Sequence, residues 1–222
     1  MRIDPKYFEI KQGSQEWLDL RGGCFSASEV AKLYRGEKDF TEGGITYIED
    51  TASESLLGLD PPVSFKNGDW GHENEPKAEA TYGKSFGVEL IQHAGQPILF
   101  DDVLKPHTWA SPDRLVPALD RGLEIKCPAT KAWHGRFCAM QSGWDLKDVK
   151  LEYYAQVQMC MLVFECDKWD FMSFHPNVPA FARAAVFTIE RDEVFLRKLT
   201  ERLYTAVILK SDFVQRIKNN LL

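Results

Sequence analysis

The order of hydrophobic and polar residues predicts a chain in which helices alternate with short strands. Residues 15–21 mix apolar and polar side chains and are followed by Gly22 and Gly23, which predicts a brief helix that ends at these glycines. The segment Ser26-Ala27-Ser28-Glu29 has the form of a capping box, with Ser26 as N-cap and Glu29 at the third helical position. We therefore expect a second helix that continues through Leu33.

The next stretch is richer in turn-forming residues. Residues 36–68 contain many glycines and acidic residues together with Pro61 and Pro62, which predicts a short helix at 47–57 and a mobile loop. A further helix should begin near Gly71 and run to Tyr82, with Pro76 in its first turn.

The middle of the chain favours strands, and the last third returns to helices. Short apolar runs separated by turn residues predict strands at 96–100, 108–111, 114–116 and 123–126. A helix is expected at 151–164 and an alternating strand at 169–174. The spacing of Phe195, Leu199, Leu203 and Ala206 predicts an amphipathic closing helix over 191–209. Helices around a central sheet indicate an α/β core, and we predict one domain over 1–222.

Composition restricts the class of protein. A hydrophobic share of 44% and a charged share of 27% are ordinary for a globular chain. No long apolar run and no secretion signal is evident, so we expect a cytoplasmic protein without a membrane segment. The five cysteines form no C-x-x-C pair, which predicts reduced thiols rather than zinc ligands. The net charge of −6 argues against a nucleic-acid coat protein but allows a local basic groove.

Two short motifs carry the chemistry. Ser111-Pro112-Asp113 is followed by Glu124-Ile125-Lys126, and on a strand Glu124 and Lys126 point to one face while Ile125 points into the core. A hairpin would place Asp113 beside Glu124, where two carboxylates and the Ile125 carbonyl suit a hard divalent cation. Lys126 would then orient or deprotonate the attacking water. The alternative is an exposed hairpin whose Glu–Lys pair faces solvent.

The flanking residues carry a family resemblance. Six segments resemble, in order and in separation, the phage lambda exonuclease or YqaJ-like viral recombinase family of PD-(D/E)XK nucleases: 17–21, 26–30, 70–75, 111–113, 123–128 and 154–158. The resemblance implies a restriction-endonuclease-like core, in which helices flank a mixed central sheet. The Asp113–Glu124 gap is about one residue longer than expected, 35–66 does not match, and nothing after 175 is diagnostic.

The resemblance also implies an active site. Asp113, Glu124 and the Ile125 carbonyl would bind Mg²⁺, for which Mn²⁺ could substitute, and Lys126 would be the catalytic lysine. Glu75 would be the helix-borne acid near the metal, holding a second ion or a metal-bound water.

Further residues are assigned by the same resemblance. Gln156 would position the nucleophile or the phosphate, and Arg21, Ser28 and Ser111 would bind the 5′ phosphate of the strand being cut. A guanidinium binds phosphate bidentately, and hydroxyls near a helix start add donors.

Simpler interpretations exist for three of these positions. Glu75 in a first helical turn would complement the helix dipole, and Arg21 would be a surface charge near Asp19. Gln156 and Gln158 would be solvated positions on a helix.

The resemblance implies an enzyme that binds the end of linear duplex DNA in a bacterial host and digests the 5′-terminated strand processively. Its relatives form homotrimeric rings and leave a 3′ single strand for a phage-type annealing protein. The alternatives are a RecB-like nuclease, an endonuclease, or a non-catalytic DNA-end-binding module. The last would have a broken metal triad, whereas Asp113, Glu124 and Lys126 are all present.

Overall fold

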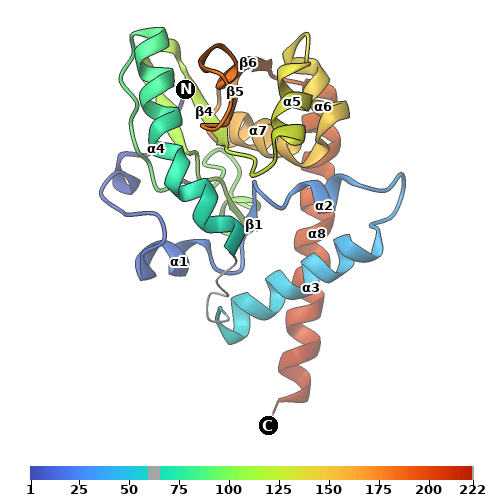
Figure 1. Ribbon diagram of the computed structural model, residues 1–222. Coiled ribbons are helices and arrows are strands. Elements are labelled where there is room, and N and C mark those ends of the chain that lie inside the picture. The colour runs from blue at the N-terminus through green and yellow to red at the C-terminus, as the bar shows by residue number, and fades with distance from the viewer. Residues whose placement is uncertain (60–65, 222) are drawn as a thin grey trace.

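A mixed sheet organises the fold of the computed structural model, which describes residues 1–59 and 66–221 (Figure 1). Within these residues the strands are β1 (Phe25–Ser26), β2 (Thr108–Trp109), β3 (Arg114–Val116), β4 (Arg121–Lys126), β5 (Lys168–Phe174) and β6 (Ala184–Glu190). The α-helices of the described residues are α1 (Gln15–Arg21), α2 (Ala31–Tyr34), α3 (Glu42–Leu57), α4 (Lys66–Phe86), α5 (Lys131–Cys138), α6 (Leu146–Val149), α7 (Leu151–Val163) and α8 (Glu193–Asn220).

The main sheet has the strand order β3-β4-β5-β6 in the described part of the chain, and β1 pairs separately with β2. Strands β3 and β4 form an antiparallel hairpin, β4 and β5 run parallel, and β5 and β6 are antiparallel. A parallel pair needs a crossover connection, which α5, α6 and α7 supply. Figure 1 shows α4 on one side of the sheet and these three helices on the other.

Alternating side chains of the sheet bury two apolar layers. Leu123 and Ile125 of β4 pack with Ala78 and Tyr82 of α4. On the other face, Phe171 contacts helical aromatic residues that include Phe137 of α5, with ring centroids 5.2 Å apart. Glu124 and Lys126 follow the alternation and point to this second face, because Ile125 faces α4.

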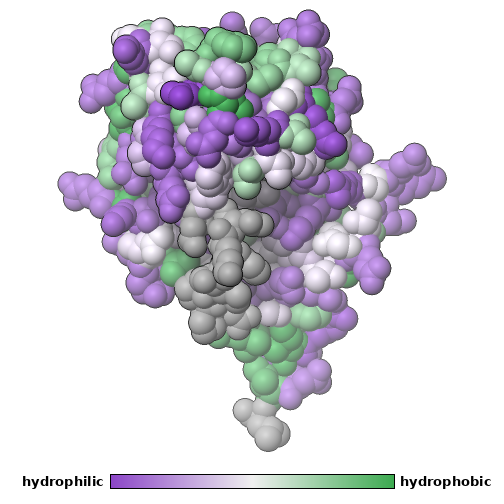
Figure 2. All heavy atoms as spheres, in the orientation of Figure 1, coloured by the Kyte–Doolittle hydropathy of each residue, from purple (hydrophilic) through white to green (hydrophobic). Residues whose placement is uncertain are grey.

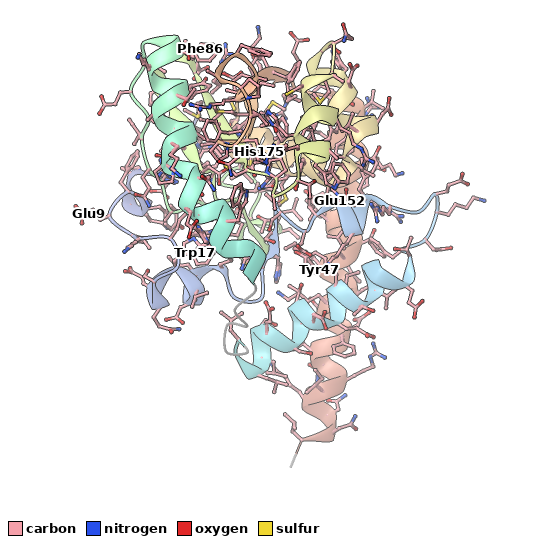
Figure 3. The ribbon with its side chains drawn as sticks, in the orientation of Figure 1. Glu9, Trp17, Tyr47, Phe86, Glu152 and His175 are labelled. Atoms are coloured by element: carbon pink, nitrogen blue, oxygen red, sulfur yellow. The ribbon has the colours of Figure 1, made fainter. Side chains whose placement is uncertain are left out.

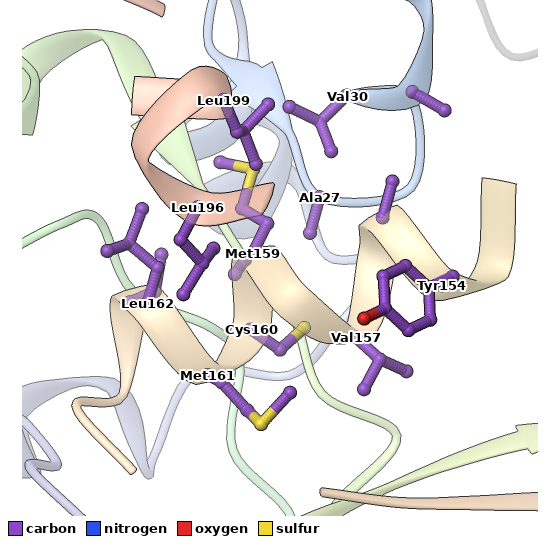
Figure 4. Close-up of a cluster of buried hydrophobic side chains, with 14 of the residues drawn as sticks. Ala27, Val30, Tyr154, Val157, Met159, Cys160, Met161, Leu162, Leu196 and Leu199 are labelled. Carbon is purple, nitrogen blue, oxygen red and sulfur yellow. The ribbon is translucent and has the colours of Figure 1, made fainter. Parts of the chain in front are cut away.

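Helix α7 is buried on nearly all sides, which explains its apolar sequence. Its residues Tyr154 to Val163 are all buried, and several contact α8 (Figure 4). On α8 this contact includes Leu196 and Leu199. The four residues of the predicted apolar stripe are all buried, as expected: Phe195, Leu199, Leu203 and Ala206. The Asp192 side chain caps α8 by accepting a hydrogen bond from the Phe195 N–H at 2.9 Å.

Helix α8 is longer than the predicted 191–209. It continues to Asn220, and its last turns project from the body of the molecule beside α3 (Figure 1). Residues 193–220 contain no glycine or proline, so no helix-breaking residue ends the helix at the point where its buried stripe ends.

The predicted capping box at Ser26 is wrong. Ser26 lies in β1, and its N–H donates to the Tyr47 hydroxyl at 2.8 Å, so it belongs to a buried strand pair. A turn closed by the Glu29 N–H and the Ser26 carbonyl follows, and the helix itself covers only Ala31 to Tyr34.

Two other local predictions are corrected. Helix α4 begins at Lys66, so Pro76 lies in its interior rather than in its first turn. The side chain of Pro76 is exposed, where water can bond the carbonyl that the missing N–H leaves free. Residues 96–100 form only an isolated bridge from Gln96 to Ala110, because Pro97 has no N–H to continue a ladder.

Several predicted elements are confirmed at nearly the expected bounds, namely β3, β4, α7 and β5. The helix predicted at 47–57 begins earlier, at Glu42, after the Thr41 cap. Part of the loop predicted before α4 lies at 60–65, outside the described residues. Helix α5 and strand β6 were not predicted. No helix in the described ranges is long and apolar enough to cross a membrane, and the five cysteines, all of them described, are free thiols.

Candidate active site

The β3–β4 hairpin brings the two acidic residues of the motif together, as predicted. Its register pairs Arg114 with Leu123, which places Asp113 opposite Glu124. An Oδ2 atom of Asp113 accepts a hydrogen bond from the Ile125 N–H at 2.6 Å. The strands are joined by a 3₁₀ turn, η3 (Pro117–Leu119), and by Asp120 in the left-handed region at φ 51°, whereas Arg121 and Gly122 already belong to β4.

Glu124 is a fully buried carboxylate, with 0% of its surface exposed. The Lys126 ammonium contacts it as an ion pair, yet neither carboxylate oxygen has a hydrogen-bond partner of good geometry among the described residues. Burial, and then the charge of Asp113, raise the pKa of Glu124 to about 8. One ammonium cannot offset both carboxylates when both are ionised, so Glu124 keeps its proton to an unusually high pH, and a bound cation would favour its ionised form.

Lys126 lies between these carboxylates and α7. Burial alone would lower its pKa, but Glu124 and Asp113 raise the pKa of Lys126 above the ordinary value. Its Nζ also lies 4.9 Å from the centre of the Tyr153 ring. The lysine is therefore held as a cation, with a quarter of its side chain exposed.

Helix α4 supplies further acids at the edge of this group. Glu75 and Glu79 lie one turn apart, and Arg114 is 2.5 Å from Glu79 and 4.0 Å from Glu75. Burial, followed by the charge of Asp113, raises the pKa of Glu75. The interpretation of Glu75 as a first-turn dipole residue is wrong, because α4 begins at Lys66.

The donor set fits a hard divalent cation. Within residues 1–59 and 66–221 no three His, Cys, Asp or Glu side chains are already gathered in a ligand arrangement. The chemistry still matches, because Glu124 presents two buried oxygens without hydrogen bonds and Asp113 lies opposite it on the hairpin. Oxygen donors of this kind bind Mg²⁺ or Ca²⁺ rather than a soft metal.

Gln156 and Gln158 are both buried, so their interpretation as solvated positions is wrong. Gln158 is used structurally, because its amide donates to the Glu190 carbonyl at 2.8 Å and accepts from the Asp192 N–H at 2.9 Å. Gln156 lies three residues after Tyr153, on the side of α7 where Tyr153 meets Lys126.

Arg21 and Ser28 come close to each other through Ser26. The Ser26 hydroxyl accepts from Arg21 at 3.4 Å and lies 3.2 Å from the Ser28 hydroxyl. The guanidinium also lies 5.2 Å from the centre of the Trp17 ring, a residue labelled in Figure 3. Asp19 accepts a hydrogen bond from Gln15 at 2.8 Å, and no ion pair between Asp19 and Arg21 is present among the described residues.

Ser111 stands apart from this group. Its hydroxyl donates to the Ala94 carbonyl at 2.8 Å and accepts from the indole N–H groups of Trp17 and Trp109 at 3.2 and 2.9 Å. The structure therefore joins Arg21, Ser26 and Ser28, whereas Ser111 is joined to them only through the Trp17 ring.

Three residues of the site were missed at the level of sequence: Arg114, Tyr153 and Ser26. Arg114 directly follows Asp113, and Tyr153 precedes Gln156 by one helical turn, so their positions were a usable signal. Ser26 gave no such signal because its four-residue context favours a helix cap.

The mixed sheet, with a Pro-Asp hairpin next to a Glu-Ile-Lys strand, has the architecture of the PD-(D/E)XK class of nucleases. Solved structures share the fold. An alkaline exonuclease from Laribacter hongkongensis superposes with a TM-score of 0.77 at 23% identity, covering 93% of this chain and 97% of that one. A phage-related exonuclease from Haemophilus somnus 129PT gives a TM-score of 0.72 at 17% identity, covering 90% and 98%.

The chain belongs to the family of the YqaJ-like viral recombinase domain, whose family model matches residues 16–167. The match includes every residue of the candidate site, from Arg21 to Gln156. A structure of the Laribacter hongkongensis exonuclease in complex with dAMP superposes with a TM-score of 0.78 at 23% identity, covering 93% of this chain and 97% of that one. No curated protein matches the chain.

Proposed function

We propose that the protein is a magnesium-dependent exonuclease that digests the 5′-terminated strand of linear double-stranded DNA. The family and the exonucleases that share the fold support a nuclease. The observation that carries the proposal is the buried Glu124 carboxylate. It lies next to Asp113 and Lys126, and within the described part of the chain its oxygens accept no hydrogen bond. Such a group lowers the stability of the fold when no cation is bound, and it can serve as a ligand when a cation binds.

Asp113, Glu124 and the Ile125 carbonyl would hold Mg²⁺, or Mn²⁺ in its place, with Glu75 at the edge of the site. When bound, the ion supplies Lewis acidity toward the phosphodiester and lowers the pKa of water. Arg114 keeps Glu75 and Glu79 on the side of α4 that faces Asp113, because it contacts both carboxylates.

Lys126 and Gln156 would act on the substrate itself. The ammonium of Lys126 is fixed by Glu124 and by the Tyr153 ring, so it can orient the attacking water and offset charge on the phosphate. The amide of Gln156, one turn along α7 from Tyr153, can hydrogen-bond the nucleophile or a phosphate oxygen.

Arg21 and Ser28 would bind the 5′ phosphate, with Ser111 supporting them. The Arg21–Ser26–Ser28 group is a cation with two hydroxyls, which suits a phosphate monoester. Because the Ser111 hydroxyl already donates to the Ala94 carbonyl and accepts from Trp17, its contribution would be to hold the Trp17 ring next to Arg21.

The proposal extends to assembly. A homotrimeric ring around the duplex would explain processive digestion, because the enzyme could leave only at a DNA end. A basic channel would also be compatible with the net charge of −6. The retained 3′ strand would pass to a single-strand annealing protein in the cytoplasm of a bacterial host.

The test is digestion of linear duplex DNA with a 5′ phosphate in the presence of Mg²⁺, next to a covalently closed circle. We expect shortening of the linear DNA from its 5′ ends, an intact circle, and loss of activity in Asp113→Ala. Asp212→Ala, which removes an exposed carboxylate from α8, is the matched control and should digest normally. Cutting of the circle would instead identify an endonuclease, and no cleavage of any duplex would leave a binding module.

A further inference from the structure

A groove separates α4 from the loop that joins β5 to β6. Its volume is about 660 Å³, and its walls include Lys77, Thr81 and Lys84 of α4 together with Phe181 and Arg183 of the loop. Figure 1 shows this loop near the C-terminal half of α4, and Figure 2 shows apolar and hydrophilic residues mixed over the same end of the molecule.

The groove is basic although the chain is acidic. Lys77, Lys84 and Arg183 line it, and none of its described lining residues is acidic, whereas the net charge of the chain is −6. Lys77 and Lys84 are seven residues apart, about two turns or roughly 10 Å along the helix axis. The cations are therefore spread along the groove, which is the arrangement that the successive phosphates of a polyanion require.

One wall of the groove carries an exposed aromatic ring. Phe181 lies in a short 3₁₀ turn, η5 (Ala180–Ala182), and is 91% exposed. The turn is held from behind, because the Ala182 carbonyl lies 2.7 Å from Nε2 of the buried His134 and the His175 N–H donates to the Arg183 carbonyl at 2.9 Å. Figure 3 shows His175 between α4 and α5, below this loop.

The groove and the candidate active site lie on two sides of one helix. Glu75 and Glu79 contact Arg114 on one side of α4, whereas Lys77 and Lys84 face the groove on another. Lys126 pairs with Ser173 in the parallel β4–β5 register, so the loop after β5 leaves the sheet at the end where Lys126 lies.

We propose that this groove binds single-stranded DNA, with Lys77, Lys84 and Arg183 at the phosphates and Phe181 stacked on a base. Cations combined with an aromatic platform are what a strand with unpaired bases needs, because paired bases offer no free face to the ring. The proposal rests on the proposed function, in which the occupant is the 3′-ended strand that digestion leaves behind.

The first experiment measures binding of a fluorescein-labelled (dT)₂₀ by anisotropy, with EDTA present so that cleavage plays no part. We expect Phe181→Ala to weaken binding by about 5- to 150-fold, the range for truncation of a stacking residue. Phe100→Ala, which removes another exposed phenylalanine outside the groove, should bind like the wild type.

The second experiment tests the phosphate contacts through salt. For Lys84→Gln the slope of log K against log salt should fall in magnitude by about 0.7, the value for one lost contact to a single strand. Lys218→Gln, at the exposed end of α8, is the charge-matched control and should leave the slope unchanged.

The outcomes separate the two proposals. If Phe181→Ala and Lys84→Gln bind (dT)₂₀ like the wild type, the groove does not bind single strands. The exposed Phe181 ring would then be a candidate contact for a protein partner. Equal loss on a blunt duplex would also overturn the single-strand assignment. A wild-type protein that binds (dT)₂₀ through these residues but cleaves no DNA would overturn the exonuclease proposal alone.

Discussion

At the scale of single residues, Glu124 combines a cost to stability with a role in binding. The fold buries this carboxylate completely, and its oxygens have no hydrogen bonds to the residues that the structure describes. A buried charge with incomplete pairing destabilises a protein, and a bound cation removes that cost. Metal binding and stability should therefore be linked through this one side chain.

The first prediction follows from this link. Mg²⁺ should stabilise the wild-type protein against heat, by about 2.7 kcal/mol when its concentration is a hundred times Kd. Glu124→Gln should lose both the Mg²⁺-dependent shift in Tm and the activity, and its metal-free Tm should be at least as high as that of the wild type. Differential scanning calorimetry with and without Mg²⁺ measures both. An unchanged Mg²⁺ response in Glu124→Gln would remove Glu124 from the ligand set.

A second residue-scale prediction concerns pH. His93 is fully buried, its Nδ1 accepts the Gly95 N–H at 3.1 Å, and its Nε2 lies 3.2 Å from the Asp4 carbonyl. Burial lowers the pKa of His93 below its ordinary value of 6.5. The unfolded chain then binds a proton more readily than the folded one, so stability is full above pH 6.5 and is lost as pH falls below it.

The measurement is urea unfolding at pH 7.5 and 5.5 for the wild type and His93→Gln, whose amide can make the same two hydrogen bonds. The wild type should lose at most about 1.4 kcal/mol more per pH unit than the variant in this range. Identical pH profiles for the two proteins would show that His93 contributes no such dependence.

At the scale of elements, one buried network fastens α4 to the sheet. The Tyr82 hydroxyl donates to Asp170 of β5 at 2.5 Å, and Asp170 also accepts from Arg121 at 3.0 Å and from Thr188 at 2.7 Å. The network joins α4, β4, β5 and β6, so it fixes the helix that carries Glu75 relative to the strand that carries Glu124.

The third prediction tests this network. Tyr82→Phe removes the hydroxyl and should lower the free energy of unfolding by about 1.5–3 kcal/mol, the range for a hydrogen bond to a charged group. Tyr204→Phe also removes a tyrosine–aspartate hydrogen bond, to Asp101, but at an exposed position, and should cost less than about 1 kcal/mol. Chemical denaturation compares them, and equal losses would contradict the role of burial.

The success of the sequence-based predictions varies with the origin of each element's stability. Elements with a clear local signal, such as the continuous apolar run of α7 and the alternation of β5, were predicted nearly at their bounds. Strand β6 was missed because most of its residues are only half-buried, so its apolar pattern is weak. Ser26 was placed in a helix because a capping box is local, whereas the β1–β2 pair depends on residues 108–109.

In the candidate site, too, features set by local sequence were predicted and features set by distant contacts were not. The pairing of Asp113 with Glu124 followed from hairpin geometry within a dozen residues and is confirmed as a contact in the fold. The place of Arg114 next to Asp113 is visible in the sequence. Its contacts with Glu75 and Glu79 could not be predicted, because they depend on where α4 packs against the sheet. The roles of all these residues in catalysis stay predictions, as does a single domain over 1–222.

At the scale of the whole molecule, the fourth prediction concerns assembly. Light scattering after size exclusion should give a mass of about three times 25.4 kDa if the protein forms the proposed ring. On long linear DNA with an excess of unlabelled competitor, the assembled protein should finish the molecules on which it started. A monomer that is equally processive would contradict the explanation of processivity by encirclement.

The parallel pairing of β4 with β5 has a consequence for the order in which the candidate site can form during synthesis. Glu124 and Lys126 lie on β4, but their neighbouring strand is made only after the α5–α7 crossover, some forty residues later along the chain. A nascent chain on the ribosome therefore carries the hairpin with its acidic residues and its lysine before the strand that pairs with β4 has been made. We therefore expect the candidate site to stay inactive until β5 emerges and completes the sheet.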